Sequence, residues 1–398
     1  MPALLEKKRD GHPLVSEEIE WIISQLPILP REQIGAFLMA CQLQGLNQDE
    51  TSSLTLAMLE SGHRFKSSPE RVDKHSTGGV GDKMSLILAP ALRAAGATVP
   101  MLAGRGLAHT GGTIDKLESI PGFNTGLTLE QMRDNPCFIS RQTPEIAPAD
   151  SILYQIRDIT GTVPCIGLIT ASIISKKAAE GLDRLVLDVK CGRAAFMKTR
   201  ADAEELADSM KQTGMSLGIE VSTQINTMDY PIGNFVGNAH EVYESILCLK
   251  GQGPEDTMSL VYSQADSLGY DIRSAIEDGS ALEEFKQMCI RQGVGSEIAN
   301  SLVNDPWAVL PRAEKSVEIR AQSSGTISDI DALVIGQVLC EIGAGRSIPN
   351  QEIDHGIGIQ LFVNVGTQIE AGELMMRIDC NELSDEIKTR FSNSISIE

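Results

Sequence analysis

The chain has 398 residues, of which 42% are hydrophobic and 22% charged, and these proportions exclude a chain that is disordered throughout. Its 54 acidic and 34 basic residues give a formal net charge of −20, which disfavours general binding to nucleic acid. An anionic substrate would therefore need a local cluster of cations that reverses the field of the whole protein.

The length predicts about two to three domains, at roughly 150 residues for each domain. The eight cysteines occur singly, without a C-x-x-C pair or the spacing of zinc ligands, and predict reduced thiols. The opening residues, MPALLEKKRDGHPL, lack the apolar run of a signal peptide, and no apolar run reaches the roughly 18 residues of a membrane helix. We therefore expect a cytoplasmic protein with no membrane segment.

The N-terminal segment has the pattern of helices and shows no strand. We expect Ser16 to cap a first helix and a second helix to cover about residues 33–43. Asn47 followed by Glu50 is the pattern of a capping box, which predicts a third helix that ends at Gly62.

The pattern then changes to short apolar strands that alternate with helices. Strands are predicted at residues 98–102, 136–140, 184–190 and 219–226, and helices at 84–95 and 200–217. This alternation predicts right-handed crossovers and a mostly parallel sheet. Residues 149–180 have the pattern of two helices broken near Gly161 and Pro164, and residues 238–305 are again helical.

The predicted fold class is α/β, with a small all-helical domain, a larger α/β domain with a mostly parallel sheet, and a C-terminal α+β subdomain. We place the helical domain at residues 1–65, with residues 150–182 rejoining it. The α/β domain covers residues 70–149 and 183–310, and the C-terminal subdomain, with short strands and glycine turns, covers residues 315–398.

A first glycine-rich loop, DKHSTGGVGDKMS at residues 73–85, leaves a predicted strand and enters a predicted helix. Glycines allow backbone N–H groups to approach a ligand, and a helix N-terminus carries partial positive charge, so this loop suits a phosphate. Lys74, Ser76 and Ser85 add donors, and His75 is placed for acid–base work or for orienting a ligand. The spacing is not that of a Walker A loop, and a glycine turn without a ligand remains the alternative.

A second glycine-rich loop, GRGLAHTGGT at residues 104–113, also follows a predicted strand. It begins like a dinucleotide fingerprint but has His109 where the third glycine should be. If the two loops follow strands of one sheet, they face the same crevice at the carboxyl ends of those strands.

A third set of polar residues is Arg157, Ser172 and Lys176. Ser172 and Lys176 are four residues apart on a predicted helix and therefore share one face. A guanidinium, a hydroxyl and an ammonium group suit the carbonyls and imide of a planar heterocycle, although such residues also decorate ordinary helix surfaces.

The segments KHSTGGVGDK, GRGLAHTGGTIDKLESIPGF, LITASIISKK and LDVKCGRAAF resemble the thymidine phosphorylase and pyrimidine-nucleoside phosphorylase family, and the resemblance covers nearly the whole chain. It implies a homodimer that associates through the helical domain, with an active site between the helical and α/β domains. The implied reaction is reversible phosphorolysis of thymidine or deoxyuridine to the free base and 2-deoxy-α-D-ribose 1-phosphate. Inorganic phosphate is a co-substrate, and the resemblance implies no cofactor and no metal.

The resemblance also assigns residues one by one. The phosphate-binding positions are Lys74, Ser76, Ser85 and Thr113. The pyrimidine-binding positions are Arg157, Ser172 and Lys176, with Tyr154, Leu107 and Ile169 lining the base pocket. His75 matches a histidine near the glycosidic bond, so the implied catalytic residues are His75, Arg157 and Lys176.

The sequence departs from the family pattern at several of these places. Ala103 stands where the family has a serine of the phosphate site, and Ala108 stands where it has a glycine. Loss of the serine removes one donor, which is worth about 1–3 kcal/mol toward a charged acceptor. Met101 matches a position that can hold a lysine in members that accept uridine, so we expect a preference for deoxynucleosides. Met101 as a plain buried strand residue is the alternative.

Some bacterial members hold a monovalent cation near the first loop, and the matching positions here include Lys83 and Glu244. A lysine ammonium carries the charge of potassium but cannot ligate it, so we expect Lys83 to replace the cation and reach Glu244. Other interpretations stay open: a broad pyrimidine-nucleoside phosphorylase, a related anthranilate phosphoribosyltransferase, or a non-catalytic signalling protein on the same fold.

Overall fold

The structure, a computed structural model, describes residues 1–106, 109–346 and 351–398. The chain forms two compact units. The first unit comprises residues 1–73, 142–189 and 201–225, and the second comprises residues 74–141, 190–200 and 226–398. The division differs from the predicted one, because residues 183–189 and 201–225 pack with the helices of the first unit rather than with the predicted α/β domain.

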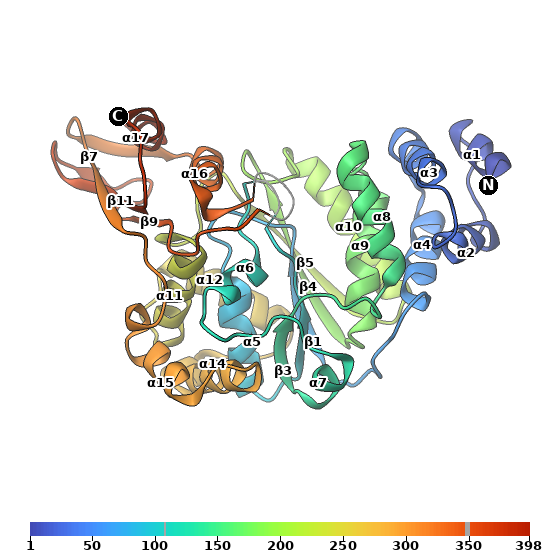
Figure 1. Cartoon of the computed structure of the whole chain (residues 1–398), viewed down its shortest axis with the longest axis horizontal. Coiled ribbons are helices and arrows are strands. Elements are labelled where there is room, and N and C mark those ends of the chain that lie inside the picture. The colour runs from blue at the N-terminus through green and yellow to red at the C-terminus, as the bar shows by residue number, and fades with distance from the viewer. Residues whose placement is uncertain (107–108, 347–350) are drawn as a thin grey trace. The chain divides into compact units, whose positions relative to one another are not determined.

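The first unit combines a helical assembly around one apolar core with strand residues 184–189 and 220–225 (Figure 1). Its helices are α1 (Pro2–Arg9), α2 (Ser16–Gln25), α3 (Arg31–Gln44), α4 (Gln48–Glu60), α8 (Pro148–Thr160), α9 (Ile166–Ala179) and α10 (Arg200–Ser216). Helix α4 packs on α2 and α9, and α3 packs on α1 and α8. Ile34, Phe37 and Leu38 of α3 are fully buried in this core. The predicted return of the later helices to the N-terminal ones is therefore present, since α8 and α9 share the core of α3 and α4.

Local hydrogen bonds explain where these helices begin and end. The capping box of α4 is confirmed, because Glu50 N donates to Asn47 Oδ1 at 2.8 Å and Asn47 N donates to Glu50 Oε2 at 3.0 Å. The prediction that Ser16 caps α2 is wrong, because Ser16 is already the first helical residue and its hydroxyl lies 2.8 Å from that of Ser53. Helix α8 ends as predicted at Gly161, whose φ of 68° favours glycine.

Among the described residues, six segments form strands in the α/β part of the chain. A sheet with the order β1–β4–β5 contains β1 (Val72–Ser76), β4 (Arg184–Cys191) and β5 (Glu220–Thr227). Strands β2 (Val99–Leu102) and β3 (Cys137–Ser140) pair in parallel as a separate sheet, and β6 (Phe235–Gly237) pairs elsewhere. The expectation that both glycine-rich loops follow strands of one sheet is therefore wrong. Pro100 in β2 has no N–H to donate, and a proline confines a strand to a sheet edge.

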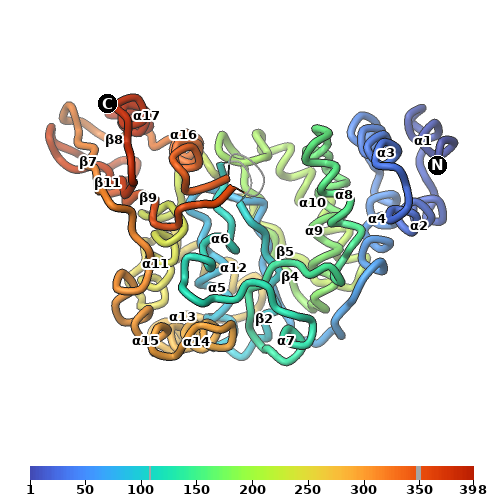
Figure 2. The backbone as a smooth tube through the Cα atoms, viewed as in Figure 1, coloured from blue at the N-terminus to red at the C-terminus, as the bar shows by residue number. Residues whose placement is uncertain are grey.

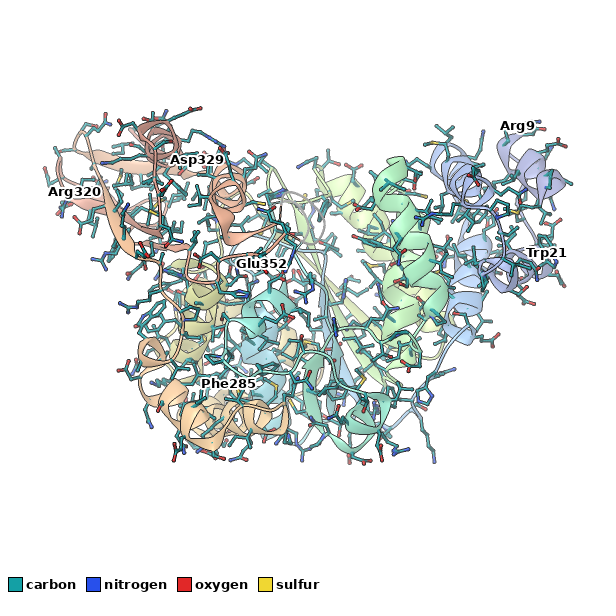
Figure 3. All side chains as sticks on the ribbon, viewed as in Figure 1. Arg9, Trp21, Phe285, Arg320, Asp329 and Glu352 are labelled. Carbon is teal, nitrogen blue, oxygen red and sulfur yellow. The ribbon has the colours of Figure 1, made fainter. Side chains whose placement is uncertain are left out.

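The second unit is built around helix α5 (Met84–Ala94), whose side chains are nearly all buried. Up to residue 308, the helices of this unit are α5, α6 (Thr113–Glu118), α7 (Leu129–Asp134), α11 (Asn238–Leu249), α12 (Glu255–Ser267), α13 (Arg273–Glu277), α14 (Ser280–Arg291), α15 (Ser296–Asn304) and the 3₁₀ turn η1 (Pro306–Ala308). Helices α11, α12 and α14 pack against α5, and Phe285 of α14, labelled in Figure 3, is completely buried. Because α5 directly follows the first glycine-rich loop, this packing fixes one end of that loop.

The C-terminal part of the second unit is α+β, as predicted (Figure 2). One sheet has the order β6–β9–β11–β7, with β7 (Lys315–Arg320), β9 (Gly358–Leu361) and β11 (Leu374–Cys380). A second has the order β10–β8–β12, with β8 (Gly325–Ile330), β10 (Gln368–Ile369) and β12 (Ile395–Ile397). Helix α16 (Ala332–Leu339), the π-helical turn η2 (Cys340–Ala344) and α17 (Asp385–Asn393) complete it. Within the described residues, no helix has both the length and the apolar character needed to cross a membrane.

Candidate active site

The first glycine-rich loop is organised around a buried carboxylate that the sequence did not single out. Lys74 Nζ lies 3.3 Å from Asp82 Oδ1, and Ser76 Oγ donates to Asp82 Oδ2 at 2.5 Å. Gly78 N donates to Ser76 Oγ at 3.2 Å. Two of the predicted phosphate donors, Lys74 and Ser76, therefore converge on one point, and Asp82 occupies it in this structure.

Cations surround Asp82. Burial alone would raise the pKa of its carboxyl, but the charges of Lys74, Lys190 and Lys116 and the Ser76 hydrogen bond hold that pKa well below its usual range. Asp82 is therefore an anion at neutral pH, and it faces three lysines. This cluster gathers cations at one place in a chain whose net charge is −20.

Two glycines of the first loop lie so close to neighbouring segments that a Cβ atom at either position would clash. Gly81 has a φ of 77°, and a Cβ there would lie 2.4 Å from the Ile232 carbonyl oxygen. A Cβ on Gly79 would lie 2.4 Å from Met228 Sδ. Any side chain at these positions would push the loop away from the structure beneath it.

The second glycine-rich loop meets the first through one lysine. Lys116 Nζ donates to Asp82 O at 2.8 Å and to Gly111 O at 3.2 Å, and it lies 3.0 Å from Glu241 Oε2. Lys116 therefore joins the two loops, although their strands belong to different sheets; that the loops face one crevice stays a prediction. Thr113 is the first residue of α6, which follows the second loop, and Ser85 lies in the first turn of α5, which follows the first. Both predicted phosphate ligands are thus at helix N-termini.

The start of the second loop is held by Asp115. Gly106 N donates to Asp115 Oδ2 at 2.7 Å, and the guanidinium groups of Arg105 and Arg346 donate to Asp115 Oδ1 at 3.0 and 2.6 Å. A Cβ on Gly112 would lie 2.0 Å from Gly106 N, so the loop closes tightly on itself. Leu107, predicted to line the base pocket, and Ala108 lie outside the described residues.

The remaining predicted residues of the second unit lie on its strands and loops. His75 is half-buried in β1, and His109 Nε2 lies 2.7 Å from the Ala194 carbonyl oxygen. Ala103 extends the ladder between β2 and β3, because its N–H donates to Ser140 O at 2.9 Å. Met101 is 1% exposed in β2, as its alternative interpretation as a buried strand residue requires.

The third predicted group assembles on helices α8 and α9 of the first unit. Lys176 Nζ donates to Ser172 Oγ at 3.3 Å, which confirms that these two residues share a helix face. It also donates to Asp150 Oδ2 at 2.7 Å. Asp150 is buried in the first turn of α8, and sequence reasoning missed it because no spacing connects it to a lysine 26 residues later.

Arg157 is buried and holds the connection between α8 and α9. Its Nε, Nη1 and Nη2 atoms donate to the carbonyls of Thr162, Leu168 and Val163 at 3.3, 3.1 and 2.8 Å. Burial lowers the pKa of the guanidinium, which nevertheless stays charged. These three bonds use three of the five donors of the side chain, so Arg157 has both a structural role and donors for a ligand.

Tyr154 and Ile169 lie on the same two helices. The Arg157 guanidinium carbon lies 5.9 Å from the centre of the Tyr154 ring, and the Tyr154 side chain is 37% exposed. Burial of the hydroxyl raises the pKa of Tyr154, so it stays neutral at physiological pH. Ile169 is half-buried on α9. That these two residues line a base pocket stays a prediction.

The predicted contact between Lys83 and Glu244 is confirmed. Lys83 Nζ donates to Glu244 Oε2 at 2.5 Å and to the Ile232 carbonyl at 2.8 Å, and both side chains of the pair are almost completely shielded from solvent. Burial opposes the charge on Lys83, but the carboxylates of Glu244 and Glu241 raise its pKa above the usual value. Among the described residues, no three histidine, cysteine, aspartate or glutamate side chains are grouped to hold a metal ion.

A buried triad uses residues that neighbour the predicted site residues in the sequence. Lys177, next to Lys176, donates to Asp73 Oδ2 and to Glu180 Oε1, the latter at 2.9 Å. Burial raises the pKa of Glu180 well above its usual value, and the neighbouring Asp73 charge adds to this, while Lys177 opposes it. The triad is therefore stable when Glu180 is protonated, because the single charge of Lys177 then faces one carboxylate, that of Asp73.

Comparisons with known proteins agree along the whole chain. Three family models match it: the helical bundle domain of the glycosyl transferase family at residues 2–62, the a/b domain of that family at 68–277, and the pyrimidine nucleoside phosphorylase C-terminal domain at 326–398. The thymidine phosphorylase of Homo sapiens is 43% identical over 406 residues, which cover 95% of this chain and 84% of that protein. The pyrimidine-nucleoside phosphorylase of Geobacillus stearothermophilus is 41% identical over 420 residues, which cover 100% of this chain and 96% of that protein.

The fold is also similar to a solved structure. The crystal structure of anthranilate phosphoribosyltransferase from Thermus thermophilus matches with a TM-score of 0.57 over 72% of this chain and 98% of that one. At 16% sequence identity, this likeness concerns the fold alone.

Proposed function

The chain belongs to the thymidine phosphorylase and pyrimidine-nucleoside phosphorylase family, and on this premise we propose that it catalyses the reversible phosphorolysis of pyrimidine nucleosides. Thymidine or deoxyuridine reacts with inorganic phosphate to give the free base and 2-deoxy-α-D-ribose 1-phosphate. The enzyme is a pentosyltransferase of nucleoside salvage and catabolism. The family membership and the α/β fold class both agree with the resemblance seen in the sequence.

The observation that best supports a phosphate co-substrate is the cation cluster at the first loop. Lys74, Lys116 and Lys190 surround Asp82 in a chain whose net charge is otherwise strongly negative. A phosphate bound there accepts hydrogen bonds from Lys74, Ser76 and the loop amides, and from Ser85 and Thr113 at the two helix N-termini.

The base is proposed to bind to Arg157, Ser172 and Lys176. The Lys176 ammonium has three donors and gives two of them to Asp150 and Ser172, which leaves one for a pyrimidine carbonyl. The Asp150 carboxylate orients that ammonium. Tyr154, Ile169 and Leu107 contribute apolar surface around the ring.

In the reaction, a phosphate oxygen forms a bond to C1′ while the bond from C1′ to N1 of the base breaks, with inversion at C1′. The electron pair of the broken bond leaves with the base, which becomes an anion. Arg157 and Lys176 stabilise that anion, and a protonated His75 donates to the base or neutralises it. Holding both reactants in place supplies much of the remaining acceleration.

We further infer that the protein is a homodimer formed through the helical domain and that it needs no cofactor. Support for the dimer comes from large apolar side chains exposed on α2, α3 and α4 and on the α2–α3 turn: Trp21, Ile28, Leu43 and Leu56. Trp21 is labelled in Figure 3. Light scattering on the purified protein tests this, and a monomer at micromolar concentration would contradict it. A cytoplasmic location is likewise an expectation.

The decisive experiment is a substrate panel of thymidine, deoxyuridine and uridine, each with and without phosphate, with release of the free base as the readout. We expect release that depends on phosphate and is fastest for the two deoxynucleosides. No release from any of the three would favour the non-catalytic alternative, and equal rates for all three would favour a broad pyrimidine-nucleoside phosphorylase. Anthranilate phosphoribosyltransferase activity is not proposed, because only the fold supports it.

A further inference from the structure

The segment from Gly192 to Lys198, here called the 192–198 segment, directly follows β4 and folds into a tight turn. Gly192 has a φ of 122°, and its N–H donates to the Met197 carbonyl at 3.0 Å. Arg193 N donates to Asp229 Oδ1 at 2.8 Å. A Cβ on Gly192 would lie 2.5 Å from that same oxygen, so the turn is pressed against Asp229.

This segment touches both glycine-rich loops. The Ala194 carbonyl oxygen lies 2.7 Å from His109 Nε2 of the second loop. The Phe196 ring centre lies 6.3 Å from that of His109, and a Phe196 ring carbon lies 3.7 Å from the Cβ position of Gly78 in the first loop. The ring is 37% exposed, so it covers the loops on one side and faces solvent on the other.

The Arg193 side chain ties the same segment to the C-terminal part of the second unit. Its Nη1 donates to Asp329 Oδ2 at 2.7 Å, and its Nη2 donates to Asp329 Oδ1, which makes a bidentate pair. Nη1 also lies 3.5 Å from Asp331 Oδ2, and Nε donates to the Asp229 carbonyl at 3.3 Å. Every nitrogen of the guanidinium therefore has a partner, although 35% of the side chain is open to solvent.

One partner of Arg193 caps α16, and this helix also lies close to the loops. Asp329 lies in β8, and Asp331 caps α16 by accepting a hydrogen bond from Val334 N at 3.0 Å. Gly336, in the second turn of α16, is so close to the loops that a Cβ there would lie 2.5 Å from the His109 carbonyl oxygen and 3.0 Å from Val80 Cγ2. The 192–198 segment thus contacts the His109 ring, α16 lies close to the His109 backbone, and Arg193 joins the segment to the residue that caps α16.

We propose that Arg193 is a positioning residue for phosphate binding, and this rests on the proposed function. It touches no reactant. By clamping the 192–198 segment to Asp329 and Asp331, it holds Phe196 and the Ala194 carbonyl against the two loops, so that the loop donors are preorganised for phosphate. Loss of the clamp raises the cost of ordering the loops when phosphate binds, whereas the base-binding residues on α8 and α9 do not depend on it.

The kinetic test uses Arg193→Ala and Asp329→Asn in the full chain. We expect KM for phosphate to rise about tenfold, and KM for thymidine to change less than about twofold, because only the phosphate half of the site loses preorganisation. Arg193→Lys keeps the charge but not the bidentate geometry, so its phosphate KM should fall between those of the wild type and Arg193→Ala. A change that affects both KM values equally, or neither, overturns the proposal.

Arg320→Ala is the matched control. Arg320 forms an ion pair with Glu318 in the same C-terminal region and also donates to Gly372 O at 2.9 Å, but none of these partners touches the 192–198 segment. Figure 3 labels both Arg320 and Asp329. Arg320→Ala should leave phosphate KM at the wild-type value. An equal rise in Arg320→Ala and Arg193→Ala would mean that general loosening of this region explains the effect, and the proposal would fail.

A second measurement needs no catalysis. Chymotrypsin cleaves after accessible phenylalanine, and a clamp that holds Phe196 should slow cleavage there. We expect Arg193→Ala to be cut after Phe196 about fivefold faster than the wild type under native conditions, and saturating phosphate to protect the wild type more than the variant. Unchanged cleavage in Arg193→Ala refutes the clamp.

The charge-exchanged pair Arg193→Asp with Asp329→Arg adds a rescue test. If the direct pair matters, the double variant should recover phosphate KM to within about threefold of the wild type, while each single exchange remains impaired. Failure of the proposed function is recognised separately, because the wild type would then release no base at all. An active wild type with unaltered Arg193 variants defeats only the positioning role.

Discussion

The buried pair of Lys83 and Glu244 gives a sharp prediction, because its two charges are removed from water and depend on each other. Both side chains are at most 1% exposed, and they meet at 2.5 Å. Removing one partner of such a pair leaves an unpaired buried charge and costs about 3–5 kcal/mol. In Lys83→Met, Glu244 keeps hydrogen bonds from the N–H groups of Asn234 and Phe235 at 2.8 and 3.1 Å. We therefore expect Lys83→Met to lower the free energy of unfolding by about 3 kcal/mol, near the lower end of that range.

The assay is denaturant unfolding at pH 7, supported by thermal melting, where this loss corresponds to a fall in Tm of roughly 5–10 °C. The double variant Lys83→Met with Glu244→Leu should be more stable than Lys83→Met alone, because it buries no lone charge. A loss below about 1 kcal/mol in Lys83→Met would refute the reasoning, since the energetic role assigned to the pair would then be wrong.

The same position tests whether lysine stands in for a metal ion. Lys83→Thr replaces the ammonium with a potential ligand and leaves the Ile232 carbonyl and Glu244 beside it. Potassium chloride should then raise the Tm of Lys83→Thr more than sodium chloride does, and the wild type should show no such difference. Wild-type activity that requires potassium would contradict the substitution of the cation by lysine.

The remaining predictions concern the reactants and pH. Lys176→Ala should lower kcat/KM for thymidine about 10²–10³-fold and should also lower Tm, because the buried Asp150 carboxylate loses its partner. Arg157→Ala is the less direct test, since it removes three bonds to backbone carbonyls. Ala103→Ser should lower KM for phosphate about tenfold if it restores one donor. Glu180 has a raised pKa in the folded state, so the folded protein binds the Glu180 proton more tightly than the unfolded chain and loses stability as pH rises above the ordinary value of 4.5. Glu180→Gln should therefore gain stability relative to the wild type as pH rises above 4.5, and a pH-independent difference would contradict this.

The helices and strands could be predicted because their signals are local. The capping box at Asn47 is complete within four residues, and the break between α8 and α9 follows from Gly161 alone. The pairing of strands was not local. The sequence predicted a strand at residues 98–102, but only the structure shows that β3 is its partner.

The roles of the predicted site residues stay predictions, and what the sequence missed are the carboxylates that contact them. Asp150 orients Lys176 from another helix, and Asp73 meets Lys177 across 104 residues. Asp82 lies within the first loop itself, yet nothing in its spacing indicates that Lys74 and Ser76 turn toward it. Buried charged side chains pair with residues that are close in space, and such pairs have no characteristic spacing in the sequence.

Asp82 also bears on the stability of the proposed phosphate site. Buried lysines that lie close together repel one another and bear a desolvation cost. The Asp82 carboxylate and, for Lys116, the Glu241 carboxylate lower that cost, and the three ammonium groups in turn keep Asp82 ionised. It also holds the Ser76 hydroxyl and the Lys74 ammonium near one point, where a phosphate can take over their donors. At the proposed phosphate site, an uncharged residue at position 82 would remove the carboxylate that Lys74 contacts, whereas a carboxylate nearer to a bound phosphate would repel it.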